Sequence, residues 1–169
     1  MIPDKFERKG EFRFLDTWVF PIPIQDWLKD LMKSLYIHPK SLTHVCCGKS
    51  RIGGLKIDID ASLKPDIAAD ILDLPWILGN NSQAHTLADF PWQISYSDRR
   101  YFSYALRDIT EEGGYVIINS PWNPWVKGLK LIRCYKVFQS FNSYRDLVDF
   151  WLFQKATSKE NERFYFDNR

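Results

Sequence analysis

The sequence has few of the features that mark specialised classes of protein. Only three cysteines occur in 169 residues, and Cys46 and Cys47 are adjacent within an apolar segment. This arrangement excludes a disulfide framework and favours reduced thiols in the core. The formal net charge is only +2 at pH 7. A chain-wide polycation is therefore excluded, and any nucleic-acid site has to come from local clusters of charge.

The sequence also lacks long apolar runs and recognisable metal motifs. No stretch approaches the roughly 20 apolar residues that a membrane span needs. The first five residues are charged and do not resemble the apolar region of a signal peptide, so we expect a cytoplasmic protein. The histidines His38, His44 and His85 have no metal-ligand spacing with the cysteines. We therefore expect neither a membrane anchor nor a metal site.

The length predicts a single domain with a sizeable core. Residues 1–40 would form an N-terminal arm and helix, residues 41–155 the core sheet, and residues 156–169 a polar tail. Apolar residues recur at helical spacing over residues 25–36, which predicts an amphipathic helix. A second helix is predicted over residues 101–109.

Short apolar segments predict the strands of an α/β sheet. The segments span residues 42–47, 55–59, 66–69, 90–96, 115–119, 129–140 and 147–155. The first three end near Gly48, Asp58 and Asp70. In an open α/β sheet, ligands bind outside the carboxyl ends of the strands. A glycine there allows close backbone approach, and a carboxylate can accept hydrogen bonds from ribose hydroxyls.

This order of motifs resembles the S-adenosylmethionine-dependent methyltransferases with the Rossmann-like fold. The family's first motif, an acidic residue followed by Gly-x-Gly-x-Gly, corresponds to His44, Cys46, Gly48 and Ser50, so one glycine remains. Residues 57–60 resemble the second motif and residues 69–75 the third. The resemblance covers about residues 40–155. It implies a three-layer fold with a mostly parallel sheet, a C-terminal antiparallel strand pair, and S-adenosyl-L-methionine as cofactor.

The resemblance also assigns cofactor-binding residues. Cys46 and Gly48 would form the cofactor turn, Asp58 would hold the ribose, and Asp70 with Ile71 would contact the adenine. Asp60 lies beyond the strand end and is a further candidate. The alternative for Asp58, Asp60 and Asp70 is that their carboxylates cap the turns that follow them.

The connection between the first two strands is unusually short. Only residues 49–54 separate them, whereas parallel neighbours normally need about a dozen residues or more, usually a helix. The helix after the first strand is therefore reduced or absent. Gly53 and Gly54 would permit an extended loop, which we favour. If the two strands are antiparallel instead, the methyltransferase interpretation fails.

A catalytic motif is predicted after the fourth strand. Ser97-Asp98-Arg99-Arg100-Tyr101 resembles the Asp-Pro-Pro-Tyr of amino-methylating DNA and RNA methyltransferases. By this resemblance Asp98 would orient or deprotonate the nucleophile, and Tyr101 would stack on a flipped base. Arg99 and Arg100 replace both prolines. They would pair with an anionic part of the substrate, or they are solvated surface charges.

Two tryptophans follow the fifth strand at the expected rim of the active site. Trp122 and Trp125 are candidate substrate-binding residues, because tryptophan stacks on nucleobases. They could equally fill the core where a helix is absent, and we favour that role.

The predicted function is transfer of a methyl group from S-adenosylmethionine to an unidentified acceptor, with nucleic acid as one candidate. The sulfonium methyl is already activated, so the protein mainly has to position the nucleophile. The main alternative is a non-catalytic methyltransferase-like module that binds a nucleotide or nucleic acid. The lost glycines, the missing helix and the two arginines support it. A third alternative is another nucleotide-binding α/β enzyme.

Overall fold

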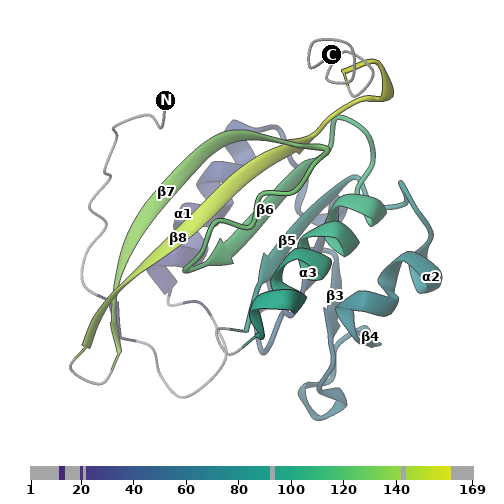
Figure 1. Ribbon diagram of the computed structural model, residues 1–169. Helices are drawn as coiled ribbons and strands as arrows, with labels where there is room; N and C mark the ends of the chain where they lie inside the picture. The colour runs from purple at the N-terminus through teal and green to yellow at the C-terminus, as the bar shows by residue number, and fades with distance from the viewer. Residues whose placement is uncertain (1–11, 14–19, 21, 92–93, 142–143, 161–169) are drawn as a thin grey trace.

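The computed structural model describes residues 12–13, 20, 22–91, 94–141 and 144–160. One sheet organises them (Figure 1). Its strands are β1 (Phe12–Arg13), β2 (Leu42–Val45), β3 (Leu55–Asp58), β4 (Ile67–Ala68), β5 (His85–Asp89), β6 (Tyr115–Ser120), β7 (Leu129–Phe141) and β8 (Tyr144–Lys155). The α-helices are α1 (Ile22–Ser34), α2 (Leu74–Leu78) and α3 (Tyr96–Ile109), and the 3-10 turns are η1 (Pro39–Ser41), η2 (Ala61–Leu63) and η3 (Ile71–Asp73).

The eight strands have the order β1-β7-β8-β6-β5-β2-β3-β4. The strands β4, β3, β2, β5 and β6 are mutually parallel, and β8 runs antiparallel to both β6 and β7. The prediction of a mostly parallel sheet with a C-terminal antiparallel pair is confirmed. At the outer edge, β1 pairs in parallel with β7.

Helices cover the two faces of the sheet, which gives three layers (Figure 1). α2 and α3 lie on one face, where Leu74, Leu106 and Ile109 are fully buried. α1 lies on the other face and buries Ile24 and Leu28. The apolar spacing predicted α1 correctly, although the helix begins at Ile22 and ends at Ser34. No helix among the described residues is long and apolar enough to cross a bilayer.

The short connection between β2 and β3 is an extended loop. The two strands pair in parallel, with Thr43 opposite Leu55 and Val45 opposite Ile57. The antiparallel alternative is therefore excluded, and the preferred prediction is confirmed. The loop returns to the beginning of β2, where the amide of Gly54 donates to the carbonyl of Leu42 at 2.9 Å.

Glycine is required where this loop passes close to the backbone at the start of β2. Gly53 has a φ of +96°, and a Cβ there would lie 2.9 Å from the carbonyl oxygen of Leu42. At Gly54 a Cβ would lie 2.4 Å from the carbonyl oxygen of Lys40. Both distances are too short for a real Cβ, so the two glycines allow the loop to replace a helix.

The predicted fourth strand is wrong. Residues 90–96 contain no strand among those described; the strand is β5, which ends at Asp89. Pro91 has no N–H for a strand ladder. The side chain of Ser95 accepts a hydrogen bond from the amide of Asp98 and caps α3, which therefore begins at Tyr96 rather than at residue 101.

β5 was difficult to recognise because it contains polar residues and is buried on both faces. Its burial is nearly continuous, as expected for the interior of a parallel sheet. The polar side chains are satisfied by tertiary partners. Thr86 Oγ1 lies 2.9 Å from Thr110 Oγ1, and His85 Nδ1 accepts from the amide of Tyr115 at 3.1 Å.

Candidate cofactor and active site

Three carboxylates and one thiol lie at the carboxyl ends of the parallel strands. Asp58 ends β3, Asp89 ends β5, and Asp70 follows β4. Burial raises the pKa of the Cys46 thiol well above its usual value, and the charges of these three carboxylates raise it further. The thiol is therefore held protonated, and the chain ends of β2, β3, β4 and β5 converge on one acidic site.

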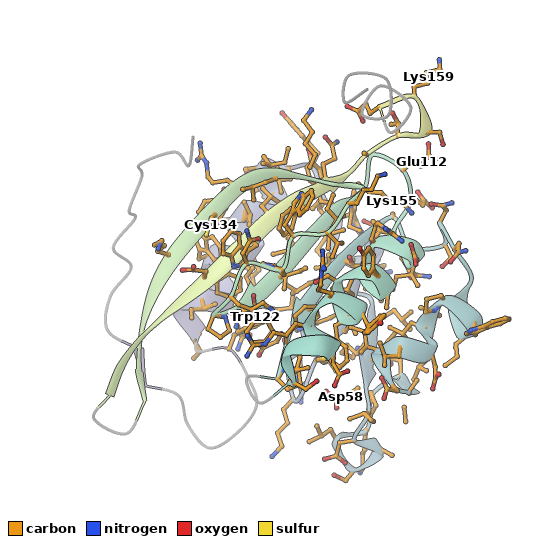
Figure 2. The ribbon with its side chains drawn as sticks, in the orientation of Figure 1. Asp58, Glu112, Trp122, Cys134, Lys155 and Lys159 are labelled. Atoms are coloured by element: carbon orange, nitrogen blue, oxygen red, sulfur yellow. The ribbon has the colours of Figure 1, made fainter. Side chains whose placement is uncertain are left out.

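Asp58 connects the loop after β2 to the end of β3. Its Oδ2 accepts from the amide of Gly48 at 2.8 Å, and its Oδ1 accepts from the amide of Asp60 at 3.0 Å. A carboxylate has about four lone-pair sites, so Asp58 retains capacity to accept from the hydroxyls of a ligand. Figure 2 shows Asp58 and Trp122 toward the same end of the sheet.

The other two predicted cofactor carboxylates cap 3-10 turns. Asp60 Oδ1 accepts from the amide of Ser62 at 2.9 Å and caps η2. Hydrogen bonds from Ser62 lower the pKa of Asp60. Asp70 Oδ1 accepts from the amide of Leu72 at 2.9 Å and caps η3. Each therefore has the structural role that the capping alternative predicted.

The cofactor turn is compact and strained at one residue. Cys46 has a φ of +53°, in the left-handed region that favours glycine, and Gly48 has the same value. The amide of Ser50 donates to the carbonyl of Cys47 at 2.9 Å and closes the turn. The predicted turn residues Cys46 and Gly48 thus lie beside Asp58, as a cofactor turn requires.

Two neighbouring positions are directed into the core. His44 is fully buried and stacks on Phe20, and burial lowers its pKa to about 4. It therefore carries no charge toward the acidic site. Ile71 is 4% exposed, so its side chain packs in the core and only its backbone could contact a cofactor.

A buried pair of side chains lies at the ends of β5 and β6, where the sequence had indicated nothing. Asp89 Oδ1 accepts from Asn119 Nδ2 at 2.8 Å. Burial raises the pKa of Asp89 to about 7, the hydrogen bond from Asn119 opposes this, and the charge of Asp58 adds to it. Asp89 is only half-buried by surface area, so it is open to a ligand from one side. The carbonyl oxygen of the Asn119 side chain is buried without a hydrogen-bond partner among the described residues.

The predicted catalytic segment lies on α3, not at a strand end. Ser95 Oγ donates to Asp98 Oδ2 at 2.5 Å, so Asp98 belongs to the N-terminal cap of the helix. Arg100 and Tyr101 lie in the first turns and are exposed. The premise that Asp98 and Tyr101 follow the fourth strand is therefore wrong, because that strand ends nine residues earlier at Asp89.

Arg99 and Trp122 join the two predicted substrate loops. The guanidinium of Arg99 lies 4.3 Å from the centre of the Trp122 ring, in cation–π contact. Trp122 also stacks against Phe90, with ring centroids 6.4 Å apart. Trp125 is 50% exposed, and its Nε1 donates to the carbonyl of Leu129 at 2.8 Å. Trp122 thus fills the core beside the site, whereas Trp125 presents one face to solvent.

The part of the chain that the structure describes contains no group of histidine, cysteine and acidic side chains that could hold a metal ion.

No family model and no curated protein matches the sequence. Solved structures do resemble it. A putative methyltransferase from Escherichia coli has a TM-score of 0.53 at 14% identity, over 85% of this chain and 92% of that one. The 16S rRNA (adenine(1408)-N(1))-methyltransferase from Catenulisporales acidiphilia, a structure with cosubstrate S-adenosylmethionine, has a TM-score of 0.50 at 10% identity, over 78% and 92% of the two chains.

The chain has the Rossmann-like methyltransferase fold. TrmN from Thermus thermophilus also resembles it, with a TM-score of 0.54 at 12% identity over 75% of this chain; the match spans 47% of the TrmN chain. At these identities the likeness establishes the fold alone. Function has to be argued from the residues of the site.

Proposed function

We propose that this protein is an S-adenosylmethionine-dependent methyltransferase whose acceptor is an amine nitrogen. The observation that carries the proposal is Asp89. It is a carboxylate at the end of β5 with a pKa of about 7, and it is held by Asn119. Asp89-Phe90-Pro91-Trp92 has the Asp, the second Pro and the aromatic residue of the Asp-Pro-Pro-Tyr motif. Trp92 itself lies outside the described residues.

The acidic site suits the proposed cofactor. S-adenosylmethionine carries a sulfonium cation, an ammonium group, ribose hydroxyls and an adenine amine, which are cations or hydrogen-bond donors. Carboxylates are their natural partners. In this proposal Asp58 accepts hydrogen bonds from the ribose hydroxyls, and Asp70 accepts one from the adenine amine. The turn at Cys46 and Gly48 contacts the cofactor through the protein backbone. The cofactor supplies an already activated methyl group.

The residues of this chain then have to bind the amine and remove its proton. The Asp89 carboxylate accepts a hydrogen bond from the amine and orients the nitrogen lone pair toward the methyl group. As the nitrogen gains the methyl, its proton passes to Asp89 and from there to solvent. A pKa near 7 suits a group that exchanges protons at neutral pH. Asn119 fixes the carboxylate so that the amine is positioned in line.

The test is transfer of labelled methyl from S-adenosylmethionine to RNA, DNA and small amines, with Asp89→Asn as the variant. Asp30→Asn is the matched control, since Asp30 is an exposed carboxylate on α1. We expect Asp89→Asn to lose about 100-fold in transfer rate while it still binds S-adenosylhomocysteine. Full transfer by Asp89→Asn would refute the role of Asp89.

A second candidate function is a non-catalytic module that binds the cofactor or a related nucleotide. The specific observation in its favour is Cys46, which holds a left-handed conformation at a place where the family has glycine. Tight binding of S-adenosylhomocysteine with no methyl transfer to any acceptor class would favour this alternative.

A further inference from the structure

A pocket lies beside the proposed cofactor turn and shares Gly48 with it. It has a volume of about 580 Å³ and lies between the crossover loop after β2, the middle of β3 and the turn around η2. Its walls are residues 47–51, Lys56 and residues 62–65. Asp58, Asp70 and Asp89 do not line it. Pockets of this size accommodate nucleotide-sized ligands.

The lining of this pocket is strongly cationic. Lys49 and Arg51 come from the crossover loop, Lys56 from β3 and Lys64 from the turn after η2, and no carboxylate lines the pocket. Asp66 lies next to it and pairs with Lys56, Nζ to Oδ2, at 3.1 Å. Within the described part of the chain, no ion pair is formed by the other three cations.

Four cations line the pocket, and the carboxylates lie at its edge: Asp66 pairs with Lys56, Asp58 accepts from the amide of Gly48, and Asp60 accepts from the amide of Ser62. Lys49, Arg51 and Lys64 form no ion pair among the described residues, so a bound anion would compensate their charges.

The fold exposes these charges because the two connections beside β3 contain no α-helix. Lys56 is opposite His44 in the parallel register. Its side chain therefore points to the face of the sheet on which α1 lies. A crossover helix over β3 would bury this side chain. The extended loop and the short turn η2 leave it half-buried at the base of an open pocket.

We propose that this pocket binds the phosphate groups of a nucleotide-sized anion. Arginine and lysine bind phosphate through charge-assisted hydrogen bonds, and three converging chain segments can surround a single phosphate chain. S-adenosylmethionine carries a net positive charge and no phosphate group, so it fits these walls less well than a phosphate does. The pocket shares Gly48 with the proposed cofactor turn but is not lined by Asp58, Asp70 or Asp89, so it is a neighbouring site that does not depend on methyl transfer.

The first experiment is a calorimetric titration of the full chain with inorganic pyrophosphate at low salt. The pocket variant is Lys49→Ala with Arg51→Ala. The control is Lys29→Ala with Lys33→Ala, which removes two exposed cations of α1 and the same total charge. We expect the pocket variant to bind about ten-fold more weakly or worse, and the control to stay within about two-fold of the parent chain.

Equal losses in both variants would overturn the proposal, because they would reflect total charge rather than a site. Absence of pyrophosphate binding by the parent chain at millimolar concentration would overturn it as well. So would displacement of pyrophosphate by S-adenosylhomocysteine, since the pocket would then belong to the cofactor site. If the double variant fails to fold, Lys64→Ala on the opposite wall provides the same comparison, with Lys33→Ala as its control.

A second titration, with a single-stranded RNA of about 12 nucleotides, distinguishes a nucleic acid from a free nucleotide as the source of the phosphate. If the RNA binds more tightly than pyrophosphate and the pocket variant loses that gain, the phosphates belong to a nucleic acid. The affinity for the RNA should then fall as the salt concentration rises, and it should fall less steeply in the pocket variant than in the parent chain. If pyrophosphate binds and the RNA does not, the ligand is a free nucleotide. Both results support the phosphate site.

Discussion

Asn119 donates a hydrogen bond of 2.8 Å to Asp89 and thereby joins the carboxyl ends of β5 and β6 at the centre of the acidic site. The two residues are directly opposite in the parallel register, so the pair is fixed by the sheet itself. The hydrogen bond stabilises the ionised carboxylate and limits the rise in its pKa that burial causes.

Asn119→Ala should raise the pKa of Asp89 further above 7, because it removes the contact that favours the charged form. The measurement is the carboxyl carbon shift of Asp89 followed by NMR as a function of pH. Ser120→Ala is the control, since Ser120 is the next residue of the same strand and its hydroxyl donates to the carbonyl of Trp122. An unchanged Asp89 titration in Asn119→Ala would show that the pair is not coupled.

Asp89 should make the free energy of unfolding depend on pH. Its pKa in the folded protein is about 7, against 3.8 as its ordinary value, so the folded state binds the proton more tightly. The stabilisation is complete below pH 3.8 and is lost as the pH rises through about 7. The loss should be on the order of 2 kcal/mol, allowing for the exposed part of the side chain.

The measurement for this pH dependence is urea unfolding at several pH values from 3.8 through about 7, the window that the two pKa values of Asp89 define. Asp89→Asn should lack this decline and should be more stable than the parent chain at the upper end. An identical decline in both proteins would assign the pH dependence to another group.

Asp58→Ala should weaken binding of S-adenosylhomocysteine by about ten-fold or more, whereas Asp60→Ala should change it by less than about two-fold. The reason is that Asp58 ends β3 and holds the amide of Gly48 in the cofactor turn, whereas Asp60 caps η2. Calorimetric titration measures both. Equal effects of the two changes would mean that neither carboxylate holds the ribose.

Ser95→Ala should destabilise the protein by about 1 kcal/mol, the usual cost of losing an N-cap. Ser95 caps α3 through the amide of Asp98, and this contact exists only because the helix begins at Tyr96. Urea unfolding measures the loss. Ser34→Ala is the control: Ser34 is exposed at the end of α1, and its hydroxyl donates to the carbonyl of Leu31 in the same helix. If Ser95→Ala leaves the free energy of unfolding unchanged, the result would favour a helix that begins at residue 101, as the sequence had predicted.

Gly53→Ala should destabilise the protein by about 1–3 kcal/mol more than Gly79→Ala. Both glycines have positive φ angles, +96° and +84°, so the conformational strain is similar. They differ in the room for a side chain. A Cβ at Gly53 would lie 2.9 Å from the carbonyl oxygen of Leu42, whereas a Cβ at Gly79 would meet nothing within 4 Å. Thermal unfolding of the two variants checks the difference.

The sequence by itself determined much of the sheet. Continuous apolar runs such as Tyr115–Ser120 and the long C-terminal pair predicted their strands, because a buried strand needs little beyond side chains that suit an apolar interior. The glycines at positions 53 and 54 also predicted the extended crossover, since only glycine permits such close approach of two backbone segments.

Tertiary structure decided where the strand that carries Asp89 ends. The polar residues of β5 are compatible with a central strand only because Thr110 and Tyr115, distant in sequence, satisfy their hydrogen bonds. Local patterning cannot reveal such partners, so the strand was placed too late and Asp98 was chosen instead of Asp89. The pairing of Asp89 with Asn119 likewise exists only once β5 and β6 are neighbours. The cationic pocket arises in the same way, because Lys49, Arg51, Lys56 and Lys64 converge only when the sheet brings three chain segments together.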